Sequence, residues 1–156
     1  MIATAKPILD LTATDLMTRD LVNMPEEMSM KQAARLLLQN RISGAPVVDK
    51  AGQCVGVISA TDFVALTKDG DQGHPSVGCT EWEVVEVETL PEDEIRKYMT
   101  ADPVTVSPNT GIGSLARQMV DAHIHRVIVV DARNKPIGIV TSTDLVAALA
   151  QADSFH

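Results

Sequence analysis

The chain has 156 residues, 45% hydrophobic and 22% charged, which suits one compact domain or two small subdomains with an aliphatic core. Its formal net charge of −8 argues against binding along a nucleic-acid backbone. No stretch approaches the roughly 18 apolar residues of a membrane helix, and the first residues lack a signal-peptide pattern. We therefore expect a cytoplasmic protein that binds neither nucleic acid nor membrane. Cys54 and Cys79 lack a metal-site spacing, which predicts two reduced thiols, with Cys54 in the core.

The sequence repeats itself after 82 positions without a gap. Residues 17–65 and residues 99–147 share 15 identities in 49 aligned positions. The repeat includes the stretches "MTRDLV" and "MTADPV", and it ends in "GVISATD" (residues 56–62) and "GIVTSTD" (residues 138–144). An internal duplication therefore organises the chain.

Each copy predicts the same elements in the same order. In the first copy, a short strand at residues 21–24 precedes a helix with apolar residues at helical spacing, then strands at 45–49 and 54–59, and a helix from Thr61 and Asp62. The second copy predicts strands at 104–107, 127–131 and 136–140, and a last helix from Thr143 and Asp144. The apolar helix positions are Met30, Ala33, Ala34 and Leu37 in the first copy, and Ile112, Leu115, Ala116 and Met119 in the second.

These patterns predict an α+β fold built from two β-α-β-β-α repeats, at residues 12–67 and 95–150. One such unit cannot cover both faces of its own sheet, so we expect the two repeats to pack sheet against sheet about a pseudo-twofold axis. The residues between them, 68–94, include nine acidic side chains. Their alternation of acidic and apolar residues predicts an extended ribbon, either a solvated acidic edge or a docking surface for a basic partner.

The two closing motifs allow two interpretations. A Ser or Thr followed three residues later by an acid is typical of a helix N-terminal cap. The same hydroxyl, carboxylate and backbone amides also suit a ribose and a phosphate, because a helix N-terminus offers free donors and a positive dipole end. Both interpretations stay open at this point.

The order "MTRDLV…AARLLLQNRISGAPVVD…GVISATD" and "MTADPVTV…LARQMVDAHIHRVIVVD…GIVTSTD" resembles a tandem pair of cystathionine-β-synthase (CBS) domains, also called a Bateman module. The resemblance covers roughly residues 12–67 and 95–150. It implies a regulatory module that binds an adenosine-containing ligand, such as AMP, ADP, ATP or S-adenosylmethionine, and that forms a disc-like homodimer. It also implies a partner protein that responds to occupancy, whose identity the sequence does not reveal.

The resemblance implies two binding clefts. In each, the motif carboxylate would bind the ribose diol, the motif hydroxyl would bind a phosphate, and the base would lie against residues of the other repeat. We expect the main cleft to comprise Thr18, Val22, Ile42, Ser43, His125, Arg126, Thr141 and Asp144, with His125 and Arg126 facing the phosphates. We expect a weaker second cleft with Ser59, Asp62, Thr100, Val104 and Ile124, also lined by His125.

Other chemistries have less support. Gly111, Gly113 and Ala116 fit a G-x-G-x-x-A pattern, and Asp131 follows at the spacing of a dinucleotide-binding fingerprint, but the four residues "SPNT" stand between the apolar part of the predicted strand and Gly111. His123 and His125 have no third ligand at a metal-like spacing, so we expect no metal. No catalytic motif is present, so we expect a non-enzymatic protein that requires no cofactor. The alternative to a nucleotide sensor is a ligand-free interaction scaffold of the same fold.

Overall fold

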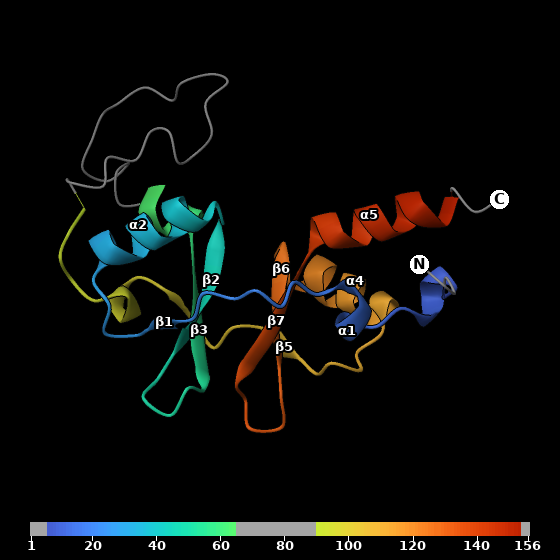
Figure 1. Cartoon of the computed structure of the whole chain (residues 1–156), viewed down its shortest axis with the longest axis horizontal. Coiled ribbons are helices and arrows are strands. Elements are labelled where there is room, and N and C mark those ends of the chain that lie inside the picture. The colour runs from blue at the N-terminus through green and yellow to red at the C-terminus, as the bar shows by residue number, and fades with distance from the viewer. Residues whose placement is uncertain (1–5, 65–89, 154–156) are drawn as a thin grey trace, which may run out of the picture. The chain divides into compact units, whose positions relative to one another are not determined.

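The computed structural model describes residues 6–64 and 90–153, and these form two compact units, each with its own sheet (Figure 1). We call them the β1–β4 unit (residues 22–64 and 90–103) and the β5–β7 unit (residues 6–21 and 104–153). The fold is α+β, as predicted. Most of the acidic insert, for which we predicted a ribbon, lies outside the described residues.

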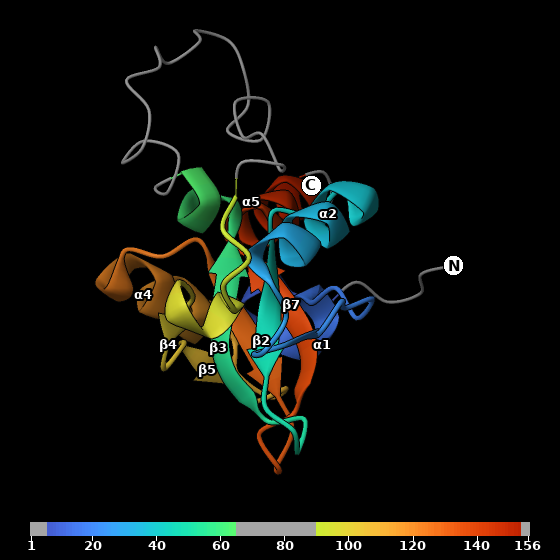
Figure 2. The same cartoon turned by 90° about the vertical axis from the view of Figure 1, so that its left-hand side faces the viewer.

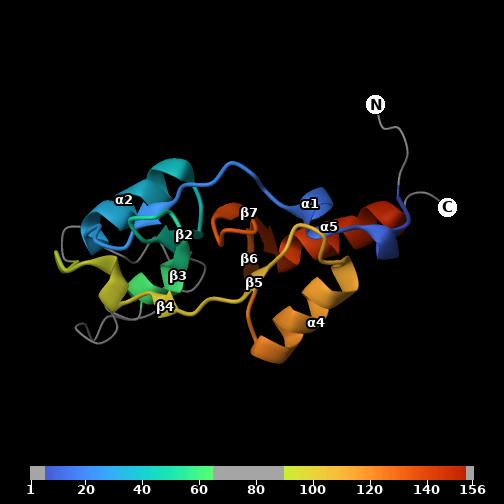
Figure 3. The ribbon, with the colours of Figure 1, turned by 90° about the horizontal axis from the view of Figure 1, so that it is seen from below.

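The β5–β7 unit contains a three-stranded sheet in the order β5-β6-β7, comprising Thr105–Val106, Arg126–Val130 and Pro136–Thr141. β5 and β6 are parallel, and β6 and β7 form the predicted hairpin. Helices α1 (Ala13–Leu16), α4 (Ile112–Ala122) and α5 (Ser142–Asp153) lie on one side of the sheet, and a short 3₁₀ helix, η1 (Ile8–Asp10), precedes them (Figure 3).

The β1–β4 unit has a four-stranded sheet in the order β1-β2-β3-β4, of which Figure 2 labels β2, β3 and β4. Its strands are Met24–Pro25, Gly44–Val48, Cys54–Ser59 and Thr100–Ala101. Helix α2 (Met30–Asn40) follows β1, a helix described over residues 60–64 follows β3, and the 3₁₀ helix η4 (Ile95–Lys97) precedes β4. Strand β4 had no counterpart among the predicted elements.

Most of the apolar positions predicted on helices α2 and α4 lie in the hydrophobic cores of the two units. Met30, Ala33, Ala34 and Leu37 are fully buried in the β1–β4 unit, and Leu115 and Met119 are buried in the β5–β7 unit. Ala116 is only half-buried, unlike its three predicted partners on α4. Cys54 is buried, as expected, and burial raises the pKa of its thiol, so it stays protonated at neutral pH.

Each unit includes a short stretch from the start of the other copy of the repeat. Thr18 pairs with Ile139 of β7, with amide–carbonyl distances of 2.9 and 3.1 Å, and 82 residues further on Thr100 pairs with Val57 of β3. The amide of Ala13 likewise donates to the carbonyl of Thr110 at 2.8 Å. The sheet of each copy is therefore completed by the "MT" stretch at the start of the other copy.

Two glycines make room for these stretches. Met17 lies against Gly138, and Met99 against Gly56, the glycines that open the two repeated motifs. A Cβ on Gly138 would lie 2.7 Å from Cγ of Met17, and a Cβ on Gly56 would lie 2.9 Å from the carbonyl oxygen of Thr100. Because these separations are shorter than real Cβ contacts, glycine is required here for space.

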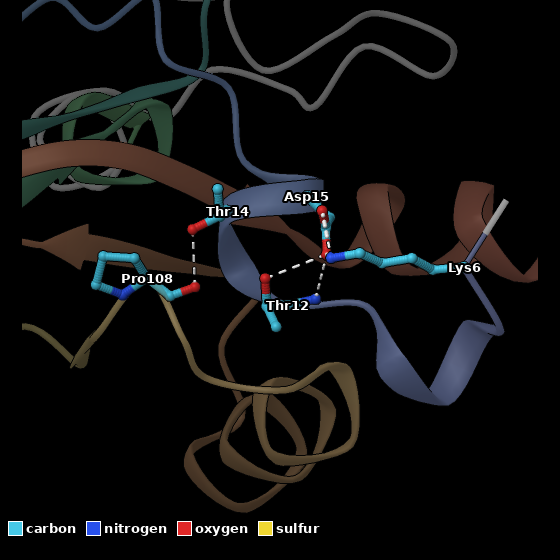
Figure 4. Close-up of polar contacts among 5 residues, drawn as sticks. All are labelled: Lys6, Thr12, Thr14, Asp15 and Pro108. Atoms are coloured by element: carbon cyan, nitrogen blue, oxygen red, sulfur yellow. Dashed lines mark hydrogen bonds and ion pairs between the residues drawn. The ribbon is translucent and has the colours of Figure 1, made fainter. Parts of the chain in front are cut away.

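Hydrogen bonds among Lys6, Thr12 and Asp15, and one from Thr14 to Pro108, hold residues 6–16 in the β5–β7 unit (Figure 4). Asp15 accepts hydrogen bonds from the amide of Thr12 at 2.9 Å and from Nζ of Lys6 at 3.0 Å. The hydroxyl of Thr14 donates to the carbonyl of Pro108 at 2.9 Å. The amide of Thr12, together with Lys6, holds the pKa of Asp15 below its ordinary value.

This cluster predicts a pH dependence. A carboxylate with a lowered folded-state pKa stabilises the fold above its ordinary pKa of about 3.9, and the contribution is lost as the pH falls through the folded-state value. Asp15→Asn should therefore lower the free energy of unfolding by about 0.5–1 kcal/mol at pH 7. Urea titrations of both proteins between pH 7 and pH 2.5 should show the difference vanish at the acidic end. A difference that is constant with pH would contradict this account.

Candidate functional site

The motif of the second copy forms a reciprocal helix cap. The amide of Thr141 donates to Oδ2 of Asp144 at 2.8 Å, and the amide of Asp144 donates to Oγ1 of Thr141 at 3.2 Å. Helix α5 begins at Ser142, one residue after Thr141 and one residue earlier than we predicted. The capping interpretation is thus correct for this turn.

The cap leaves hydrogen-bonding capacity at the same turn. Among the described residues, the hydroxyl proton of Thr141 has no acceptor and Oδ1 of Asp144 has no donor. A hydroxyl provides one donor in addition to its lone pairs, and an ionised carboxylate provides about four acceptor positions. Capping and ligand binding therefore do not exclude each other, because the cap orients groups that still have a free donor and a free acceptor.

The motif of the first copy differs in one hydrogen bond. The amide of Ser59 donates to Oδ2 of Asp62 at 2.8 Å, which matches the second copy. The hydroxyl of Ser59, however, lies 3.4 Å from the same Oδ2 and donates to it. This separation is longer than the roughly 2.5–3.0 Å of an ordinary hydroxyl–carboxylate hydrogen bond, so the contact is a weak one.

Backbone pairing brings several predicted residues to one end of the β5–β7 sheet. Arg126 is the direct cross-strand neighbour of Thr141, so their side chains lie on the same face. The carbonyl of His125 accepts from the amide of Ser142 at 2.8 Å. Of the residues predicted for the main cleft, this unit contains Thr18, His125, Arg126, Thr141 and Asp144, while Val22, Ile42 and Ser43 belong to the β1–β4 unit.

The β1–β4 unit repeats this arrangement. Gly44 is the cross-strand neighbour of Ser59, and the carbonyl of Ser43 accepts from the amide of Ala60 at 2.9 Å. Of the residues predicted for the second cleft, Ser59, Asp62 and Thr100 belong to this unit, and Val104 and Ile124 belong to the β5–β7 unit. Each unit thus contains one complete motif and its flanking strand ends.

Comparison with known proteins identifies the architecture. The family model of the CBS domain matches residues 13–69 and, a second time, residues 95–151. The chain belongs to the CBS-domain family. The predicted resemblance to a tandem CBS pair is confirmed.

Three relatives show where such pairs occur. The uncharacterized protein MJ1426 of Methanocaldococcus jannaschii is 29% identical, with 90% of this chain and 95% of that protein aligned. Homoserine O-acetyltransferase of Methanosalsum zhilinae is 26% identical over 87% of this chain, which spans only 23% of that protein. The structure of Arabidopsis thaliana CBSX2 in complex with AMP is 28% identical, with a TM-score of 0.71, and 91% of this chain and 98% of that chain are covered.

The two CBS units differ in charge at equivalent positions. Arg19, His125 and Arg126 of the β5–β7 unit correspond, after the shift of 82 residues, to Ala101, Ser43 and Gly44 of the β1–β4 unit. We had predicted roles for His125 and Arg126 but missed Arg19. The same alignment contained the signal, and the antiparallel pairing of Thr18 with Ile139 places Arg19 on the Gly138 side of that pair, away from Thr141.

The dinucleotide-binding alternative is not supported by the geometry. Oδ1 of Asp131 accepts from the amides of Arg133 and Lys135 at 2.8 and 3.0 Å, so this carboxylate shapes the β6–β7 turn and its pKa is lowered by those bonds. A Cβ on Gly113 would meet no atom of the chain within 4 Å. The fingerprint needs its acid for a ribose and its glycines for close approach, and neither role applies.

The two histidines occupy separate backbone positions. His123 ends α4 in a left-handed conformation with φ of 55°, the position that Arg41 takes after α2. His125 immediately precedes β6, and both side chains are exposed. None of the helices in the described ranges is long and apolar enough to cross a membrane.

Proposed function

We propose that the protein is a regulatory CBS pair that binds an adenosine-containing ligand and transmits its occupancy to a partner protein in the cytoplasm. The observation that carries the proposal is the Thr141–Asp144 turn. It holds, at the N-terminus of α5, a hydroxyl donor and a carboxylate oxygen that no group in residues 6–64 and 90–153 uses, with Arg126 across the strand pair. The AMP complex of CBSX2, at 28% identity, supports an adenine nucleotide as the ligand.

The chemistry of the turn assigns the roles. Oδ1 of Asp144 accepts from the ribose hydroxyls, while the Thr141 hydroxyl and the first amides of α5 donate to the nearest phosphate. Arg126 and His125 add charged or polar donors to that phosphate. Within the same unit, we assign Thr18 to the adenine side of this main site. Ser59, Asp62 and Thr100 are the residues that we assign to the second site in the β1–β4 unit.

The proposal assigns no catalytic role and no required cofactor to the chain. The ligand acts as a signal, because binding to the native state alone stabilises it and shifts its conformational equilibrium. The competing function is a CBS scaffold that binds a protein partner without any nucleotide.

Nucleotide-dependent melting separates the two functions. AMP at about 100 times its dissociation constant should stabilise the native state by about 2.7 kcal/mol, which corresponds to a rise in Tm of roughly 5–10 °C for a chain of this size. Mass spectrometry of small molecules retained by the purified protein should identify the bound species. A Tm that is insensitive to AMP, ADP, ATP and S-adenosylmethionine, with no retained nucleotide, would favour the scaffold.

We further propose a homodimer that uses an apolar surface of the β5–β7 unit. Leu9, Val120, Val146 and Leu149 are large apolar residues with 63–80% of their surface exposed, on η1, α4 and α5. Light scattering at micromolar concentration should give a dimer mass, and Leu149→Asp should shift it toward the monomer. Gln151→Asp adds the same charge on the same helix outside this set and should leave the dimer intact. A monomeric wild type would contradict the proposal.

A further inference from the structure

The β1–β4 unit is inserted into the sequence of the β5–β7 unit. Residues 22–103 form the first unit as one continuous segment, whereas the second unit is assembled from the residues before and after that segment. We propose that this insertion makes the opening of the two units hierarchical: the β5–β7 unit opens while the β1–β4 unit stays folded, but the β1–β4 unit opens only together with the β5–β7 unit. This behaviour requires no ligand, so it is independent of the proposed function.

The two hydrophobic cores depend on separate parts of the chain. All described residues of the β1–β4 core lie within 22–103, including Leu90 and Ile95 near the end of that segment. The core of the β5–β7 unit includes Ala13, which is fully buried, and Leu16 and Met17 pack against it. The β5–β7 unit is therefore complete only while the residues on both sides of the inserted segment are held together.

Sheet register gives the distance between the two ends of the inserted segment. Four residues of the β1–β4 sheet lie in one row across its strands: Met24, Val47, Gly56 and Ala101. A row of the same length crosses the β5–β7 unit: Thr18, Ile139, Ile128 and Thr105. The outer residues of each row are three strand spacings apart, about 14 Å. When it is folded, the β1–β4 unit thus holds its ends at about the separation that the β5–β7 unit requires.

Unfolding of the β1–β4 unit would remove this spacing. The β5–β7 unit would then have to close a flexible loop of 82 residues, which shifts its folding equilibrium by roughly 10³-fold toward the open state. The β5–β7 unit has 66 described residues, and units of that size are only marginally stable. The loop penalty is therefore enough to open it. The converse does not hold, because the β1–β4 segment closes no loop around the other unit.

Hydrogen exchange of the full chain, measured by mass spectrometry, tests this hierarchy with two matched variants. Val47→Ala and Val129→Ala truncate fully buried valines at equivalent positions of the two copies. Val129→Ala should speed exchange about tenfold in β6 and β7 and equally in β2 and β3, because the β1–β4 unit opens through a state in which both units are open. Val47→Ala should speed exchange in β2 and β3 and leave β6 and β7 within twofold of the wild type.

Thiol labelling and urea provide readouts that do not depend on peptide coverage or on a core substitution. Cys54 is buried on β3, so a thiol reagent such as 5,5′-dithiobis(2-nitrobenzoic acid) reaches it only when the β1–β4 unit opens. In a Cys79→Ser background, Val129→Ala should increase its labelling rate about tenfold. In the wild type, urea should open β6 and β7 at lower concentration than β2 and β3, whose opening should have the m-value of complete unfolding.

A circular permutant isolates the contribution of the insertion. A glycine–serine linker from residue 156 to residue 1, with new ends between Pro103 and Val104, makes each unit continuous without removing a residue. Helix η1 lies against α5, so the linker joins two parts of the same unit. In this permutant, Val129→Ala should speed exchange in β6 and β7 only.

Three results would overturn the inference. Each variant could affect only its own unit in the natural chain order, which would mean that the units open independently. Both variants could affect both units equally, which would mean that the chain opens as one body. The permutant could retain the effect of Val129→Ala on β2 and β3, which would mean that the insertion does not cause the coupling.

Discussion

Asp144→Asn should lower the stability of the ligand-free protein no more than Asp15→Asn does and still weaken AMP at least tenfold, whereas Asp144→Ala should destabilise the protein further and also weaken AMP. The amide oxygen of Asn can accept from the amide of Thr141 as Oδ2 of Asp144 does, so only the interaction of the carboxylate charge with the helix N-terminus is lost. Ala removes this bond as well, which costs about a further 0.5–1 kcal/mol, although Thr141 still caps the helix. Neither variant retains the ionised carboxylate that accepts from both ribose hydroxyls.

Urea unfolding without ligand, followed by calorimetry with AMP, separates the two roles of Asp144. Asp15→Asn is the matched control, because Asp15 accepts from the amide of Thr12 in a similar cap of the same unit and has no proposed contact with the ligand. It should leave AMP affinity unchanged. If Asp144→Asn binds AMP as tightly as the wild type does, the motif is a cap alone and the ribose assignment is wrong.

The order of apolar and polar residues along the chain was enough to predict the buried helix face and the two hairpins, because these elements are formed by residues close together in the sequence. The helical spacing of Met30 and Leu37 identified a buried helix face, because helix burial repeats every three to four residues. The two hairpins were predicted from short apolar runs flanked by turn residues, and the structure adds the role of the acid that ends the first run of each hairpin. Oδ1 of Asp49 accepts from the amides of Ala51 and Gln53, as Asp131 does in the second copy.

The exchange of the "MT" stretches could not be predicted in this way. Thr18 pairs with Ile139 across 121 positions of sequence, and no local periodicity encodes such a pairing. The hydrogen bonds of the two motif turns are equally inaccessible to local pattern, since Ser59 and Thr141 occupy equivalent positions in equivalent motifs yet contact different partners, Oδ2 of Asp62 and the amide of Asp144. The candidate site could therefore be predicted as residue types divided between a main and a weaker cleft, but not as a set of hydrogen bonds.

Gly138→Ala should lower the free energy of unfolding by about 1–3 kcal/mol, the usual cost of overfilling a packed site. The added methyl would lie 2.7 Å from Cγ and 2.9 Å from Cβ of Met17. Truncating the methionine removes Cγ but not Cβ, so Gly138→Ala in a Met17→Ala background should cost less without becoming neutral. Gly56→Ala should also destabilise, because its methyl would lie 2.9 Å from the backbone carbonyl of Thr100, which cannot move aside as a side chain can.

Gly113→Ala is the control, because we expect it to raise the free energy of unfolding where Gly138→Ala lowers it. Gly113 is exposed within α4, and an added Cβ would have no neighbour within 4 Å. Alanine should therefore raise the free energy of unfolding by about 0.5–1 kcal/mol through its higher helix propensity. Urea denaturation of the single variants, and of Gly138→Ala in both backgrounds, measures these differences. If Gly138→Ala were as stabilising as Gly113→Ala, Met17 would not pack on Gly138 of β7, and the contact of residues 17 and 18 with that strand would be limited to the backbone bridge at Thr18.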